Sequence, residues 1–142
     1  MDDDQVDRAD RGSGSADEPH AGGIHHLELC ASDLAASVAF WGWLLDELGY
    51  EPKSDWDGGR SWLRGSTYVV LKRADEDEPF DRTEPGLNHV AFHAASREQV
   101  DRVTEGVRGR DDASLLYEDQ HPYAGGYYED PEGVKVELVA PD

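Results

Sequence analysis

The chain repeats its own pattern once, at an offset of 63 residues. Residues 23–27 (Gly-Ile-His-His-Leu) and residues 86–90 (Gly-Leu-Asn-His-Val) each open a stretch with one strand, one amphipathic helix and three further strands. An internal duplication constrains a chain strongly, because each copy is one supersecondary unit that buries its apolar face only against a neighbour. We therefore predict two β-α-β-β-β units in a single α+β domain.

The first unit is expected at about residues 22–74. The apolar residues Ile24, Leu27, Leu29 and Cys30 predict a strand, and Ser32-Asp33 provides a helix N-cap. The following helix is indicated by apolar residues at steps of three and four, namely Leu34, Val38, Trp41, Leu45 and Leu48. Short strands are expected at residues 50–56, 60–64 and 67–72, with glycine-containing turns between them.

The second unit is expected at about residues 86–140, after an acidic linker at about 75–85. It consists of a strand over 87–92, a helix capped by Ser96, and strands over 115–118, 126–129 and 134–139. The last two strands flank a turn of sequence Asp-Pro-Glu-Gly. Residues 1–21 are acidic and rich in Gly and Ser, so we expect a disordered tail before a domain at 22–142.

The charge excludes several classes of partner. The 32 acidic and 13 basic residues leave a formal net charge of −19. Nucleic acids and anionic membrane surfaces attract basic proteins, so neither is expected as a partner.

No apolar run is long enough to span a bilayer, and the acidic N-terminus is unlike a signal peptide. With one cysteine, Cys30, the chain is expected in the reducing cytoplasm.

Two histidines occupy the same place in the two units, and one glutamate lies in the final strand. His26 and His89 each fall in the first strand of their unit, and Glu137 follows the last turn. Two imidazoles and one carboxylate are the set that holds Fe(II) or Mn(II) and leaves positions open for substrate. On these residues alone, a partly buried structural histidine at each position is the default interpretation.

Several motifs together resemble the vicinal oxygen chelate superfamily, which contains glyoxalases, bleomycin-resistance proteins and extradiol dioxygenases. They are residues 26–34 (His-Leu-Glu-Leu-Cys-Ala-Ser-Asp-Leu), 40–41 (Phe-Trp), 48–50 (Leu-Gly-Tyr), 86–92 and 129–138. The resemblance implies a curved mixed sheet whose concave face holds a divalent metal that chelates two substrate oxygens. It also implies that the metal ligands are His26, His89 and Glu137.

The resemblance favours one reaction class without excluding others. A fourth ligand, a Glu in glyoxalase I, would fall near Val70, where the chain has no carboxylate. The remaining set is similar to that of extradiol dioxygenases and fosfomycin-resistance proteins, so a dioxygenase-like enzyme with Fe²⁺ or Mn²⁺ is expected, with Zn²⁺ or Ni²⁺ as alternatives. A glyoxalase, lyase or epimerase, or a metal-free drug-binding module, are the other interpretations.

Further residues are candidates for contact with a small-molecule substrate. Catalytic roles are expected for Tyr127 and for His121, and substrate binding for Tyr128, Trp62 and Lys135. Each has a structural alternative, such as cross-strand packing for the tyrosines, core packing for the tryptophan and plain solvation for the other two. His25 neighbours the first ligand and should point to the opposite face of its strand.

We expect a homodimer. A chain with two units leaves sheet edges unpaired, and a twofold partner would cover them. As in domain-swapped members of the superfamily, such a dimer could bring His26 of one chain near His89 and Glu137 of the other. The alternative is that the whole site is made within one chain.

The acidic surface also predicts dependence on salt, because Asp-rich and Lys-poor surfaces resemble those of proteins from salt-in halophiles. At molar salt the Debye length is about 3 Å, against about 10 Å at 0.1 M, so the self-repulsion is screened only at high salt. The melting temperature should therefore fall when KCl is lowered from molar to about 0.1 M, as followed by circular dichroism. A melting curve that does not change with salt would contradict this prediction.

Overall fold

The first unit forms a complete four-stranded sheet. A computed structural model describes residues 19–117 and 126–141, so most of the expected tail and His121 lie outside the described residues. The sheet has the order β1-β4-β3-β2, with β1 parallel to β4 and the other pairs antiparallel. Its elements are β1 (His26–Ala31), α2 (Leu34–Glu47), β2 (Glu51–Trp56), β3 (Gly59–Arg64) and β4 (Thr67–Arg73).

The second unit repeats this arrangement. Its sheet has the order β5-β8-β7-β6, again with a parallel pair, β5 and β8, at one edge. Its elements are β5 (His89–His93), α3 (Arg97–Arg108), β6 (Ser114–Leu115), β7 (Gly126–Glu129) and β8 (Lys135–Val139). The expected α+β fold of two β-α-β-β-β units is confirmed, with each unit building its own sheet within the chain.

The helix caps lie where the sequence places them. The Asp33 carboxylate accepts a hydrogen bond from the Ala36 amide, and the Ser96 hydroxyl accepts one from the Gln99 amide. These side chains satisfy amides that have no partner within the helix. After α2 the chain turns at Gly49, whose φ of +91° is disfavoured for other residues. Among the described residues, no helix is long and apolar enough to cross a membrane.

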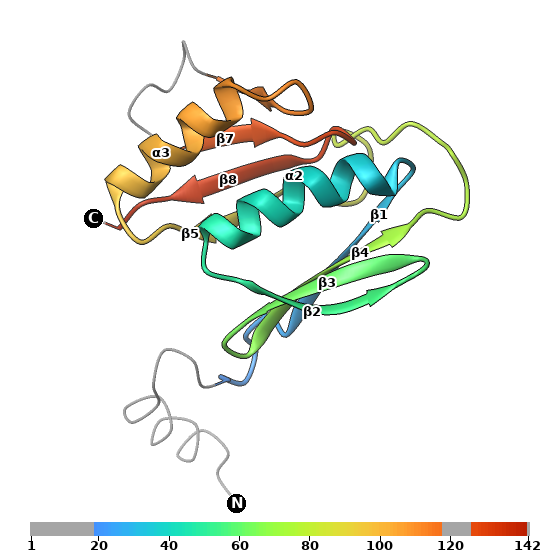
Figure 1. Ribbon diagram of the computed structural model, residues 1–142, viewed down its shortest axis with the longest axis horizontal. Coiled ribbons are helices and arrows are strands. Elements are labelled where there is room, and N and C mark those ends of the chain that lie inside the picture. The colour runs from blue at the N-terminus through green and yellow to red at the C-terminus, as the bar shows by residue number, and fades with distance from the viewer. Residues whose placement is uncertain (1–18, 118–125, 142) are drawn as a thin grey trace, which may run out of the picture.

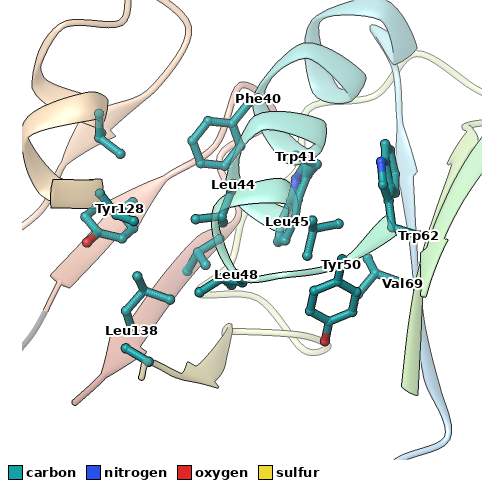
Figure 2. Packing of buried hydrophobic residues seen from close by; sticks show 14 of the residues in the cluster. Phe40, Trp41, Leu44, Leu45, Leu48, Tyr50, Trp62, Val69, Tyr128 and Leu138 are labelled. Atoms are coloured by element: carbon teal, nitrogen blue, oxygen red, sulfur yellow. The ribbon is translucent and has the colours of Figure 1, made fainter. Parts of the chain in front are cut away.

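Helix α2 is the centre of the core. It runs between the two sheets (Figure 1), and the side chains of Phe40, Trp41, Leu44 and Leu45 have no exposed surface. Figure 2 shows these side chains between Trp62 and Val69 of one sheet and Tyr128 and Leu138 of the other. A helix that contacts both sheets is apolar on most of its circumference. One apolar core therefore joins both units.

A buried carboxylate links α2 to the second unit. Asp130, which follows β7, accepts a hydrogen bond from the Trp41 indole nitrogen at 2.8 Å. Its other oxygen accepts the amides of Glu132 and Val134, each at 2.8 Å. Burial raises the pKa of Asp130, and these hydrogen bonds oppose the rise. The carboxylate thus shapes the β7–β8 turn and holds it against the helix.

Removal of this carboxylate should destabilise the whole domain. We expect Asp130→Ala to lower the free energy of unfolding by about 3 kcal/mol, because one indole and two amide N–H groups lose their acceptor in a buried site. Urea denaturation measures this difference. Asp111→Ala is the matched control, because Asp111 is exposed, and it should change stability by less than about 0.5 kcal/mol. Equal stability of the two variants would contradict the prediction.

Candidate metal centre

The candidate centre lies on the outer face of the second sheet, turned away from the core. Alternate residues of a strand point to the same face. In β8, Val136 and Leu138 are fully buried, so Lys135 and Glu137 lie on the other face. Glu137 is in register with Ala91 of β5 and with Tyr127 of β7. Sheet register therefore gathers predicted site residues from three strands.

His89 and Glu137 are close enough to bind one ion. The His89 Nε2 atom lies 3.7 Å from the Glu137 Oε1 atom, and their side chains are 39% and 19% exposed. Two donors that each lie about 2.1 Å from a shared metal are separated by roughly 3 to 3.7 Å. An imidazole and a carboxylate are also the donor types that Fe²⁺ and Mn²⁺ accept. The two side chains fit a divalent metal.

Asn88 sets the orientation of the His89 ring. The Asn88 Nδ2 amide donates to the Arg82 carbonyl at 3.1 Å, so its Oδ1 atom faces His89 Nδ1 at 2.8 Å. A carbonyl oxygen only accepts, so Nδ1 must carry the ring proton. Nε2, which lies 3.7 Å from Glu137 Oε1, then carries a free lone pair. Metal-binding histidines are commonly held in this way by a hydrogen bond to the other ring nitrogen.

In the first sheet, the preceding residue also contacts the Nδ1 atom of the histidine, which here is His26. His26 lies on the outer face of β1, stacked on the ring of Tyr68 with a centroid distance of 4.5 Å. The His25 Nδ1 atom lies 2.9 Å from His26 Nδ1. His25 is the counterpart of Asn88 in the duplicated motif, so in both units the preceding residue engages Nδ1. Within the described chain, Nε2 of His26 has no hydrogen-bond partner.

One chain brings together only two of the three predicted ligands. Among the described residues, no three His, Cys, Asp or Glu side chains gather in a cluster. His26 lies on β1 and His89 on β5, and these strands are edges of separate sheets. Helix α2 lies between the two sheets (Figure 1), so their outer faces lie on opposite sides of it. Within the described residues, His26 therefore does not join the pair formed by His89 and Glu137.

The two adjacent tyrosines have opposite environments. Tyr127 is half-buried on the Glu137 face, and burial, then the charge and hydrogen bond of Glu137, raise the pKa of its phenol. Tyr128 is fully buried, and its hydroxyl is 2.9 Å from the Thr104 hydroxyl. The expectation that Tyr128 binds substrate is therefore corrected. Strand alternation allowed either tyrosine to face the core, and packing against α3 selects Tyr128.

Trp62 is also a core residue, contrary to the expected substrate contact. It is 5% exposed and packs on Gly42 of α2. Lys135, in contrast, lies on the site face, with its ammonium 3.3 Å from the Tyr117 hydroxyl and 5.6 Å from the Tyr127 ring centroid. The hydrogen bond and charge of Lys135 lower the pKa of the Tyr117 phenol.

Three residues of this centre were not anticipated. Asn88 holds His89, Arg82 donates to Glu129 at the sheet margin, and Tyr117 contacts Lys135. The repeated motif could have indicated Asn88, because Asn88 directly precedes the predicted ligand His89. No motif in the sequence indicated that Tyr117 would lie at this site. Its φ of +58° belongs to a region that non-glycine residues rarely adopt.

Comparison with known proteins agrees with this architecture. Residues 23–138 match the Glyoxalase/Bleomycin resistance protein/Dioxygenase superfamily. The chain belongs to this superfamily. It is 48% identical over 127 residues to the uncharacterized protein YqjT of Bacillus subtilis, covering 83% of this chain and 98% of that protein.

Two further relatives are informative. The chain is 28% identical over 115 residues to the glutathione transferase FosA of Serratia marcescens, covering 81% of this chain and 78% of FosA. The crystal structure of a glyoxalase-like protein from Bacillus halodurans superposes with a TM-score of 0.79 at 46% identity, covering 84% of this chain and 96% of that one. These similarities establish the superfamily and leave the activity open.

Loss of the ring-orienting contact should weaken metal binding. We expect Asn88→Ala to reduce the affinity for Mn²⁺ about 10- to 100-fold, because His89 is no longer held with Nε2 toward Glu137. Isothermal titration of the metal-free protein measures this change. Asn88→Asp retains an acceptor for Nδ1 and should bind close to the wild type. Equal weakening in both variants would show that orientation of the ring is not the cause.

Proposed function

We propose that this protein is a divalent-metal-dependent enzyme whose ion is shared between two copies of the chain. His89 and Glu137 of one subunit and His26 of the other would hold it. The observation that carries the proposal is the pair formed by His89 Nε2 and Glu137 Oε1 at 3.7 Å, with Nδ1 of the same ring already engaged. That arrangement leaves a nitrogen and an oxygen donor directed at one point.

The unpaired edges of the two sheets support a second copy. Strands β1 and β5 each have one hydrogen-bonded neighbour, and exposed edges favour pairing with another chain. Between them lies a cavity of about 650 Å³ that is lined by both apolar and polar side chains, among them Leu27, Phe92 and Arg64. Ile24 at its rim is 77% exposed. Burial of these side chains against a twofold partner would stabilise the dimer.

The residues around the centre indicate how a substrate would be held. When bound, the metal would polarise two vicinal oxygens of a small substrate as a Lewis acid. Lys135 lies on the same face as Glu137 and supplies positive charge for an anionic group of the substrate. Tyr127, next to Glu137 in register, can donate its phenolic proton in a hydrogen bond to a substrate oxygen.

Two reaction classes are compatible with this centre. Three protein ligands suit an extradiol-type dioxygenase, which needs open positions for both the substrate oxygens and O₂. The similarity to FosA and the position of Lys135 favour a second candidate, group transfer or lyase chemistry on a small anionic substrate. Oxygen uptake with catechols, measured beside turnover of anionic epoxides and thiol adducts of 2-oxoaldehydes, separates these classes.

A subunit-mixing experiment tests whether the centre is shared. His26→Ala and Glu137→Ala homodimers should each bind metal poorly, because both of their sites lack a ligand. In a heterodimer, one site regains all three ligands and the other lacks two. Random pairing in an equal mixture makes about half of the dimers mixed, so about a quarter of the wild-type sites should return. Metal content after co-refolding in molar salt gives this fraction.

The control is His93→Ala, since His93 is an exposed histidine on the same strand as His89. This variant should retain full metal content. If the mixture binds no more metal than its separate components, the sharing of the site between chains is wrong. If all three single variants bind as the wild type does, the metal site itself is wrong, and a metal-free binding module becomes the better interpretation.

A further inference from the structure

The outer face of the first sheet carries a carboxylate that nothing within its own unit explains. Glu28 is exposed and lies two residues after His26, so both side chains are on the same face of β1. The structure gives Glu28 no hydrogen bond or ion pair. Lys72, placed by register beside Cys30 on this face, does not approach it within ion-pair distance. The side chain is therefore available to a partner outside the chain.

Comparison of the two sheets shows that this carboxylate has a counterpart one strand away. In the second sheet, Glu137 of β8 is in register with Ala91 of β5. In the first sheet, Val70 of β4 takes the place of Glu137, and its register partner on β1 is Glu28. Each unit thus has a histidine at the start of its edge strand and, two residues further along the same face, a carboxylate, on the edge strand in the first unit and on the neighbouring strand in the second. Adjacent strands are about 4.8 Å apart, which is within the reach of a glutamate side chain.

We infer that Glu28 is a fourth protein ligand of the ion held by His26, an inference that rests on the proposed function. Residues i and i+2 of a strand lie about 6.6 Å apart on one face. An imidazole and a glutamate carboxylate at that spacing converge on a single ion. The centre then contains two histidines and two carboxylates, with His26 and Glu28 from one subunit and His89 and Glu137 from the other.

This ligand set restricts the chemistry of the site. An octahedral ion with four protein ligands leaves two positions, which the two vicinal oxygens of a chelating substrate would fill. No third position remains for O₂. Glu28 therefore directs the centre toward the transfer, lyase or isomerase class. Two carboxylates also neutralise the charge of a divalent ion. The positive charge that pairs with an anionic substrate is therefore that of Lys135.

The test compares Glu28→Gln with the matched variant Glu51→Gln. Glu51 lies on β2 of the same sheet and is also exposed. We expect Glu28→Gln to bind Mn²⁺ about tenfold or more weakly than the wild-type dimer, by isothermal titration and by the Mn²⁺ paramagnetic resonance signal. Glu51→Gln should bind as the wild type does. Thermal unfolding and light scattering should be the same for all three proteins, which separates ligand loss from structural damage.

Two other outcomes are distinguishable. If Glu28→Gln binds Mn²⁺ as tightly as the wild type while His89→Ala does not, Glu28 is no ligand and the three-ligand centre stands. If His89→Ala also retains Mn²⁺, the proposed centre fails together with the inference. Equal weakening by Glu28→Gln and Glu51→Gln would show a general effect of surface charge and would overturn the role of Glu28.

Discussion

The burial of α2 between two sheets is the constraint on which the rest of the structure depends. A single helix supplies apolar side chains to both units, so each sheet must turn its inner face toward it. The outer faces, with His26 on one and His89 on the other, then point away from each other. The arrangement that buries α2 therefore also separates His26 from His89 and Glu137 within the described residues.

Polar contacts fix the helix to the second unit as well. The indole of Trp41 donates to the buried Asp130, and the Arg110 guanidinium donates to the Ala39 carbonyl at 3.3 Å. The Gln99 amide donates to the Glu47 carbonyl at 2.9 Å. Ala39 and Trp41 lie near the middle of α2, and Glu47 is its last residue. These hydrogen bonds hold the two outer faces in a fixed relation.

The two units share a framework and differ in how they distribute functional groups. Each positions one histidine at the start of a sheet-edge strand and engages its Nδ1 atom with the preceding residue, His25 or Asn88. The carboxylate lies on the edge strand in the first unit, as Glu28, and on the adjacent strand in the second, as Glu137. In both units the sheet register keeps the carboxylate on the same face as the histidine.

The sequence by itself determined the duplicated fold and the helix caps at Asp33 and Ser96. These features depend on local periodicity and on a repeated motif, which are properties of neighbouring residues. The placement of His89 near Glu137 was expected only from the resemblance to the superfamily. The sequence did not separate Tyr127 from Tyr128, because alternation gives two faces without saying which packs against a helix. Trp62 was misplaced for the same reason. Tertiary structure alone decided that Tyr128 joins the core and that His26 lies apart from His89 and Glu137, because these outcomes depend on where α2 lies between the sheets.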